Sequence, residues 1–497
     1  MLTTVAPQLE RSGPVRVLAA MRALLAEVDL GADDIYERWR PSLARRAFKL
    51  AAKNFAQYLA LRRIDIRPLQ ISLMPLGLSS LGRCEGRVRP NIAAVIDALA
   101  YQCGEPVERA ATTSRAFFRG QRLLQAETER IFGPEGQHRA VRIMVTLPTE
   151  AADDEGLIVA LVAAGMDAAR INCAHDSVDV WRKMAAHVRT AERLLGRRCI
   201  VHADLAGPKI RTLEVRARKG GRVRVGDRIA LVRNMRDAKH RGTAMTCTIP
   251  EIFNHLHAND PVWIDDGSIG CVVERISSTR AWLRVTQATD RGHKLHPDKG
   301  LNFPNTYVPA IALDDPDRKA LAAIVDAIDV VGLSFVREVA DVRSLQSELE
   351  RLGYADLPIV LKVETRDAVD NLPELLVAAA GRGPTAVMIA RGDLAVEIGY
   401  RRLAEMQEEI LWLCEAASVP VIWATQVLDG LVKCGIPTRA EITDAALSER
   451  AECVMLNKGP HVVEAVRTLA ELLPRMEAHQ TKKTSRMRAL HAWLATP

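Results

Sequence analysis

The chain has 497 residues, 48 % apolar and 26 % charged, a balance typical of a globular protein of several domains. It contains no apolar run of about 18 residues, which excludes a membrane-spanning helix, and its first residues lack the layout of a secretion signal. Nine cysteines without a C-x-x-C pair argue against a disulfide framework or a zinc site, and favour free thiols in the cytoplasm. The formal charge of +7 arises within residues 1–140, where basic residues are scattered without a stacking motif, so we predict a solvated surface rather than a nucleic-acid site.

Residues 1–138 are predicted to form a helical domain. Met21, Leu24, Leu25 and Val28 have helical spacing, and a second apolar-periodic run extends from residue 90 to 100. Turn residues at 133–136 mark the end of this domain. It contains no catalytic constellation, and its role stays unassigned.

From Arg142 onward, short apolar runs alternate with helical patterns. Eight such units in series predict a closed (β/α)8 barrel, whose chemistry lies at the carboxyl-terminal rim of the strands. The predicted strands are Arg142–Leu147, Ala168–Cys173, Cys199–Leu205, Asp329–Phe335, Pro358–Glu364, Ala386–Asp393, Pro420–Val427 and Cys453–Gly459.

One long connection interrupts the barrel, which is assigned to residues 139–211 and 309–478. Residues 212–308, between the third and fourth strands, are rich in alternating strand patterns and predict a small β-barrel. Placed at the rim, this insert would act as a lid that excludes water. Residues 479–497 form a basic tail that we expect to be frayed.

Charged residues stand where two of the buried strands end. Lys362 and Glu364 are two positions apart and therefore point to the same side of a strand, and Asp393 follows a strand-to-helix turn. Two carboxylates and an ammonium suit a divalent cation, a phosphorylated anion and a developing negative charge. Each residue alone could equally be a solvated strand end. Arg170, inside an apolar strand, is hard to explain without an anion.

Eight segments resemble the pyruvate kinase family, in the family's order and with the β insert after the third strand. They are A-G-M-D-A-A-R-I-N-C-A-H (164–175), D-L-A-G-P-K-I-R-T (204–212), V-W-I-D-D-G (262–267), K-G-L-N-F-P (299–304), L-K-V-E (361–364), V-M-I-A-R-G-D-L-A-V-E (387–397), A-T-Q-V-L (424–428) and P-T-R-A-E (437–441). The last also has capping-box spacing, so it could simply start a helix.

The resemblance implies phosphoryl transfer between phosphoenolpyruvate and ADP, giving pyruvate and ATP. It implies that Glu364 and Asp393 bind Mg²⁺ or Mn²⁺ and that Lys362 stabilises the transferring phosphoryl group and the enolate oxygen. The backbone N–H groups of Gly392 and Asp393 would receive the substrate carboxylate. Thr425 would help to bind that carboxylate and take part in protonation of the enolate.

The resemblance also assigns residues to the phosphates and the nucleotide. Arg170 would contact the substrate phosphate as a catalytic residue, and Arg211 would face the nucleotide phosphates. Asn172 and His175 would line the nucleotide side, although a histidine alone is more often structural.

Several positions depart from the family pattern for K⁺. Many members bind K⁺ through Asn, Ser, Asp and Thr, where this chain has Asn172, Ala174, Asp204 and Leu205. Lys209 stands where potassium-dependent members have a glutamate. Its ammonium, together with Asn172 and Asp204, could replace the cation, so we predict an enzyme that does not require K⁺.

Other departures leave alternatives open. The eighth strand continues into Asn457-Lys458 instead of the family's Ser-Gly, and too few residues follow Met476 for the family's regulatory domain. The altered loop leaves open a binding or regulatory protein on a pyruvate kinase barrel. A metal-dependent aldolase acting on pyruvate enolates is a further alternative, against which the β insert and Arg211 argue. Formation of a homo-oligomer is a further open alternative.

Overall fold

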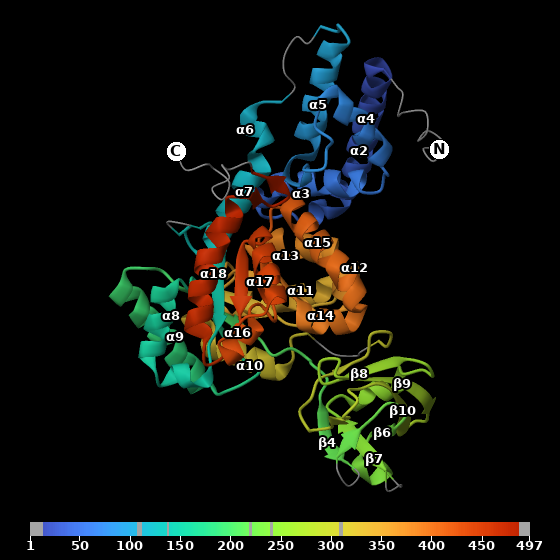
Figure 1. Cartoon of the computed structure of the whole chain (residues 1–497), viewed down its shortest axis with the longest axis vertical. Coiled ribbons are helices and arrows are strands. Elements are labelled where there is room, and N and C mark those ends of the chain that lie inside the picture. The colour runs from blue at the N-terminus through green and yellow to red at the C-terminus, as the bar shows by residue number, and fades with distance from the viewer. Residues whose placement is uncertain are drawn as a thin grey trace, which may run out of the picture.

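The computed structural model describes residues 13–106, 112–136, 139–217, 221–238, 242–307 and 312–486. The expected boundaries at 138 and 308, and the tail from 487 onward, lie outside these residues. The described chain has three parts: a helical domain, a barrel and a β-rich insert (Figure 1).

The central part is a closed barrel of eight parallel strands, which confirms the predicted fold class. Around the barrel the order is β1-β17-β16-β15-β14-β13-β3-β2. Nearly every strand residue is buried, as expected for strands covered by helices outside and side chains inside. The strands are β1 (Arg142–Thr146), β2 (Ala168–Asn172), β3 (Ile200–Asp204), β13 (Val330–Leu333), β14 (Ile359–Val363), β15 (Thr385–Ala390), β16 (Val421–Ala424) and β17 (Cys453–Leu456).

Helices surround this barrel (Figure 1). Thr438 and Glu441 form a reciprocal capping box, so P-T-R-A-E does begin a helix. The helices are α8 (Glu155–Ala164), α9 (Val178–Leu195), α10 (Asp315–Ile324), α11 (Val339–Leu352), α12 (Arg366–Asp370), α13 (Leu372–Ala380), α14 (Arg391–Ile398), α15 (Tyr400–Ala416), α16 (Asp429–Cys434), α17 (Arg439–Leu447) and α18 (Val462–Glu477).

The helical domain packs against the amino-terminal end of the barrel. Ile131 and Phe132 join the apolar cluster inside the barrel. Asn54 donates to Glu85 O at 2.7 Å and to Ala416 O at 2.8 Å, so it ties this domain to α15. Its helices are α2 (Pro14–Trp39), α3 (Arg46–Leu61), α4 (Arg67–Leu73), α5 (Val88–Gln102), α6 (Ser114–Phe117) and α7 (Arg119–Phe132).

The insert is a seven-stranded mixed sheet with its own apolar core. The strand order is β12-β8-β9-β10-β6-β7-β4, and β5 pairs separately with β11. The sheet lies at the α14 end of the barrel (Figure 1). Its strands are β4 (Thr212–Arg216), β5 (Arg222–Val223), β6 (Arg228–Val232), β7 (Thr243–Cys247), β8 (Pro261–Ile264), β9 (Ile269–Ile276), β10 (Arg280–Gln287), β11 (His293–Lys294) and β12 (Leu301–Asn302).

The first residues of the basic tail are ordered, so the expected fraying is wrong for residues 479–486. β18 (Gln480–Thr481) and β19 (Thr484–Ser485) form a hairpin. Lys482 pairs with Glu452, and Lys483 pairs with Glu85 at 2.5 Å and lies 3.7 Å from the Trp412 ring centroid. These lysines neutralise carboxylates that are otherwise buried, which fixes the hairpin between the helical domain and the barrel.

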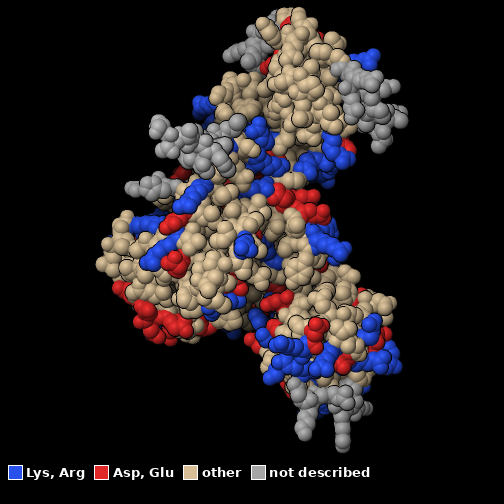
Figure 2. All heavy atoms as spheres, viewed as in Figure 1, with Lys and Arg blue, Asp and Glu red and all other residues tan. Residues whose placement is uncertain are grey.

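On the face shown in Figure 2, Lys and Arg gather where the helical domain meets the barrel, and the outer end of that domain is mostly uncharged. Within the helical domain, Arg45 pairs with Glu127 of α7 at 2.5 Å. Within the described ranges, none of the helices combines the length and the hydropathy needed to span a membrane.

Candidate active site

Lys362 is the centre of the charged cluster at the barrel rim. It lies on β14, and its side chain is only 9 % exposed. Its Nζ donates to Ser334 Oγ at 2.8 Å and lies 3.1 Å from Glu364 and 3.5 Å from Asp204. Burial would lower the pKa of Lys362, but the charges of Asp204 and Glu364 outweigh it and raise the pKa, so the ammonium form is held.

Glu364 directly follows β14, and its carboxylate lies 3.1 Å from Lys362 Nζ, so the two side chains meet as the spacing predicted. One carboxylate oxygen accepts the backbone N–H of Phe335 at 2.7 Å. Burial and the nearby charge of Asp393 raise the pKa of Glu364, against the opposing effect of Lys362. A cation bound near both carboxylates would oppose this rise and favour the ionised form of Glu364.

Asp393 lies in the first turn of α14, directly after β15. Lys209 Nζ is 2.8 Å from one of its oxygens and 3.0 Å from the other, and it is 3.3 Å from Asp266 of the insert. These carboxylates raise the pKa of Lys209 although its burial would lower it. Lys209 therefore forms its ion pairs with Asp393 and Asp266, and not with Asp204 as predicted.

Asp204, at the end of β3, is fully buried and surrounded by cationic groups. Its Oδ2 accepts from Arg170 Nε at 2.6 Å, and its Oδ1 lies 2.6 Å from His202 Nε2. Burial alone would raise the pKa of Asp204, but Lys362, Arg170 and His202 lower it well below its usual value. Asp204 thus orients two of the predicted phosphate-binding cations, Arg170 and Lys362. A side chain at Gly332 would place its Cβ 2.0 Å from Oδ1, which explains the glycine.

Gly392 and Thr425 meet at the next part of the rim. A Cβ at Gly392 would lie 2.9 Å from Thr425 Cγ2, so the start of α14 approaches Thr425 closely. Thr425 follows β16 with φ +74°, a left-handed conformation that is strained for a β-branched residue. Arg391 holds this turn, since its Nη2 donates to Thr425 O at 2.6 Å and to Asp444 Oδ2 at 2.8 Å.

The residues predicted for the nucleotide side lie on two segments: Asn172 and His175 are adjacent at the end of β2, where His175 N–H donates to Asn172 O at 3.2 Å, and Arg211 lies beside the insert. Arg211 contacts the insert, donating to Asp298 O at 3.1 Å. Asn172 ends β2 beside Asp204, and its Oδ1 accepts the N–H of Ala174 at 3.2 Å. His175 is exposed. Asp298 of the insert holds Arg211.

Sequence reasoning missed four residues of this site. Ser334 and Phe335 follow β13 and reach Lys362 and Glu364 across the barrel seam. Asp266 lies within the quoted V-W-I-D-D-G segment, and Glu397 within the segment that carries Asp393. Ser334 and Phe335 lie at the end of the predicted strand Asp329–Phe335, and Asp266 and Glu397 lie in the quoted motifs, but their contacts depend on chain folding rather than on spacing.

Glu397 links the insert to α14. It accepts from Asn302 Nδ2 at 3.1 Å, and burial raises its pKa from 4.5 to about 7. A cavity of about 430 Å³ lies beside it, between residues 301–307 of the insert and the barrel residues Phe335 and Thr365. The hollow adjoins Lys209 and is large enough for a small phosphorylated ligand.

Because the folded protein retains the Glu397 proton to a higher pH than the unfolded chain, its stability falls as pH rises from about 4.5 to about 7. Glu397→Gln removes this fall. From about pH 5 to about pH 8, the free energy of unfolding of the variant should gain on the order of 1–3 kcal/mol relative to the parent. Urea unfolding at both pH values measures the difference. Glu374→Gln, at an exposed position of α13, serves as the control, and equal pH slopes for parent and Glu397→Gln would contradict the prediction.

The carboxylates at the rim fit a divalent metal that also binds substrate. Among the described residues, no cluster of three or more His, Cys, Asp or Glu side chains could enclose an ion. Glu364 and Asp393 instead offer two hard oxygen groups whose mutual repulsion a cation would remove. Mg²⁺ commonly takes one or two protein carboxylates and completes its shell with water and substrate phosphates.

The fold and the rim define a class, that of (β/α)8-barrel proteins with a paired-carboxylate, cation-rich rim beneath an inserted β domain. Residues 138–465 match the family model described as pyruvate kinase, barrel domain. Pyruvate kinase of Mycobacterium intracellulare is 33 % identical over 355 residues, which cover 69 % of this chain and 71 % of the relative. That of Thermococcus litoralis is 33 % identical over 349 residues, or 68 % and 70 % of the two chains. Pyruvate kinase 1 of Trypanosoma brucei brucei is 31 % identical over 353 residues, 69 % and 68 %.

The chain belongs to the pyruvate kinase family. The residues that match the family model span the barrel and the insert. The helical domain precedes the matched residues.

Proposed function

We propose that the protein transfers the phosphoryl group of phosphoenolpyruvate to ADP, giving pyruvate and ATP. The observation that carries this proposal is the buried Lys362 ammonium, held between Asp204 and Glu364 at the rim. A buried cation fixed in advance stabilises charge that develops during transfer, at little cost in reorganisation.

The proposed role of each residue follows from its position at the barrel rim. Arg170, oriented by Asp204 and Thr146, binds the phosphate of the substrate. The amide groups of Gly392 and Asp393, at the start of α14, receive the substrate carboxylate. Lys362 stabilises the negative charge that passes to the enolate oxygen as its bond to phosphorus breaks and a bond to the terminal oxygen of ADP forms.

Protonation of the enolate carbon completes the reaction. Thr425 is half-buried beside Gly392, so its hydroxyl lies next to the carboxylate-binding turn. From there it relays a solvent proton to the carbon and yields pyruvate. Arg211, Asn172 and His175 contact ADP when the insert closes over the rim.

Glu364 and Asp393 would hold Mg²⁺ or Mn²⁺. A metal held by these two carboxylates would supply positive charge that neutralises the phosphate and the developing enolate. Lys209 already contacts Asp393, so its ammonium would share that carboxylate with a bound metal. This ammonium also provides the monovalent positive charge, and the proposed reaction does not require K⁺.

Glu364→Gln and Asp393→Asn should each weaken Mn²⁺ binding by about tenfold or more, because each removes one of two anionic ligands. Electron paramagnetic resonance of free Mn²⁺, with phosphoenolpyruvate present, measures the affinity. Asp370→Asn, at an exposed position of α12, is the matched control. Wild-type affinity in both rim variants would exclude this metal site.

A coupled assay of pyruvate formation tests the proposed activity. Turnover should require phosphoenolpyruvate, ADP and a divalent metal together, and a chelator should abolish it. Substrate binding without turnover would instead identify a binding or regulatory protein, and cleavage of a pyruvate-derived aldol would identify an aldolase.

A further inference from the structure

His202 is a histidine inside the barrel, directly below the charged rim. On β3, Ile200 belongs to the apolar cluster inside the barrel, so the alternation of side chains along a strand directs His202 and Asp204 to the same interior. His202 is 0 % exposed, and it pairs in register with Arg170 on β2 and Val330 on β13. The imidazole therefore lies between the apolar interior and the rim, and has no surface that a substrate could contact.

The hydrogen bonding of His202 favours a functional role over a packing role. Asp204 is ionised, because its neighbouring cations outweigh its burial and lower its pKa well below the usual value, so its oxygens only accept. Nε2 of His202, 2.6 Å from Asp204 Oδ1, is therefore the donor. Nδ1 has no hydrogen-bond partner among the described residues, and a buried polar atom of this kind costs free energy. The neighbouring interior positions Val330 and Val360 are apolar and avoid this cost.

Asp204 divides its two oxygens between different partners. Oδ1 accepts from His202, while Oδ2 accepts from Arg170 Nε at 2.6 Å and lies 3.5 Å from Lys362 Nζ. Because the two cations already balance the charge of Asp204, the hydrogen bond from His202 contributes direction rather than charge. By holding Oδ1, it prevents the carboxylate from turning about its Cβ–Cγ bond and keeps Oδ2 aimed at both cations.

Gly332 on β13 makes room for this hydrogen bond. It lies opposite Asp204 in the register of β13 and β3. A Cβ at Gly332 would lie 2.8 Å from His202 Nε2, which is too close for the two atoms to coexist. Interior positions of such barrels are mostly filled by branched side chains. The glycine on one strand and the histidine on the next thus accommodate the same contact.

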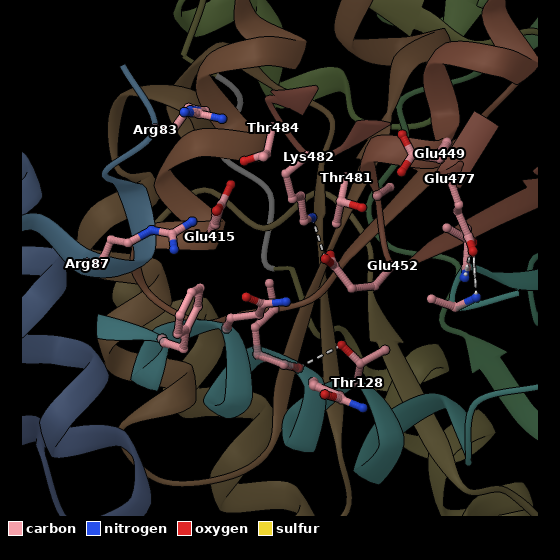
Figure 3. A pocket seen from close by; sticks show the side chains of 18 of the residues that line it. Arg83, Arg87, Thr128, Glu415, Glu449, Glu452, Glu477, Thr481, Lys482 and Thr484 are labelled. Carbon is pink, nitrogen blue, oxygen red and sulfur yellow. Dashed lines mark hydrogen bonds and ion pairs between the residues drawn. The ribbon is translucent and has the colours of Figure 1, made fainter. Parts of the chain in front are cut away.

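Buried charges at the opposite end of the barrel have a different effect. There, Lys482 of the β18–β19 hairpin pairs with Glu452, just before β17, and so joins the hairpin to the barrel (Figure 3). His202 and Asp204 instead lie two positions apart on one strand, so their hydrogen bond joins no separate elements. Its effect is on the orientation of Asp204 and of the cations that Asp204 holds.

We propose that His202 is a positioning residue for the phosphate end of the active site. Through Asp204 it holds Arg170 and Lys362 where the transferring phosphoryl group binds. The catalytic consequence rests on the proposed function, whereas the consequence for phosphoenolpyruvate binding is measured without turnover. Because Thr146 also holds Arg170, at 3.0 Å, we expect loss of the His202 hydrogen bond to cost about tenfold rather than the 10²-fold or so that a fully misplaced group can cost.

Three substitutions of His202 test the proposal. His202→Gln places an amide N–H near the position of Nε2, His202→Asn places one near Nδ1, and His202→Leu has none. Calorimetric titration with phosphoenolpyruvate and Mg²⁺ measures binding, and thermal unfolding identifies the variants that fold. We expect His202→Leu and His202→Asn to bind phosphoenolpyruvate about tenfold more weakly than the parent and His202→Gln to bind almost as tightly. His257→Leu, at a position 80 % exposed in the insert, is the control and should match the parent.

Steady-state kinetics provide a second readout. In His202→Leu and His202→Asn the KM for phosphoenolpyruvate should rise and kcat should fall. The KM for ADP should not change, because the residues proposed to contact ADP lie outside this hydrogen-bond network. A general loss of folded protein would lower kcat alone, and His202→Gln would not restore the affinity.

A double-mutant cycle shows whether His202 acts through Arg170. Arg170→Lys removes the Nε that donates to Asp204, so His202→Leu should weaken phosphoenolpyruvate binding much less in that background than in the parent. Additive losses, or parental affinity in folded His202→Leu and His202→Asn proteins, would overturn the proposal. A parent protein that binds phosphoenolpyruvate without forming pyruvate would contradict the proposed function, and the binding comparison would still decide the role of His202.

Discussion

Lys362→Met should lower kcat by on the order of 10²-fold or more, with a smaller effect on KM. Methionine preserves most of the side-chain volume but removes the cation. Lys362 Nζ lies 3.1 Å from Glu364 and is buried, so no solvent cation substitutes for it at the same point. The Lys362 ammonium stabilises the transition state more than the bound substrate, so its loss lowers kcat.

Lys362→Met also removes the positive charge that neutralises the buried carboxylates of Glu364 and Asp204. Because this loss can destabilise the fold, folding must be measured together with turnover. Steady-state pyruvate formation and thermal unfolding of the same preparation separate the two effects. Lys319→Met, at an exposed position of α10, should match the parent in both measurements. A folded Lys362→Met protein with parental kcat would remove the catalytic role from this residue.

Lys209→Glu should make the enzyme dependent on K⁺. The parent should turn over equally in Na⁺ and K⁺ buffers, because the Lys209 ammonium is fixed 2.8 Å from Asp393. Reversing its charge adds a carboxylate to the rim, and at partly buried sites a unit charge about 4 Å away is worth several kcal/mol. Turnover without K⁺ should therefore fall by on the order of 10²-fold, and K⁺ should restore part of it.

Initial rates in matched chloride buffers of Na⁺ and K⁺ measure this dependence. Lys209→Gln is the control, because it removes the positive charge without introducing a negative one. Its turnover should fall less than that of Lys209→Glu and should respond less to K⁺. A parent enzyme that works only with K⁺ would contradict the proposed role of Lys209. So would a Lys209→Glu variant that remains fully active in Na⁺.

Much of the barrel was predictable because buried parallel strands have a local signature. Eight apolar runs indicated eight strands, and the two-residue spacing of Lys362 and Glu364 indicated that their side chains share one face. Each strand ended somewhat earlier than its apolar run. The residues beyond the ends, among them Glu364, Asp393 and Thr425, leave the sheet and supply the rim.

The remaining contacts have no local signature. Lys209 reaches Asp393 across 184 positions, and Ser334 meets Lys362 only because β13 lies beside β14. The left-handed conformations of Phe335 and Thr425 occur at residues that rarely adopt them, so no sequence rule predicts those turns. The hairpin at 480–485 was missed because its lysines resemble a solvated tail until their buried partners are known.

Phosphorus NMR of the purified protein with phosphoenolpyruvate, ADP and Mg²⁺ follows the transferred group itself. The phosphoenolpyruvate signal should decay in step with the growth of the γ-phosphate signal of ATP, in Na⁺ buffer as well as in K⁺. A phosphoenolpyruvate signal that persists, or that converts to inorganic phosphate alone, would contradict phosphoryl transfer at this rim.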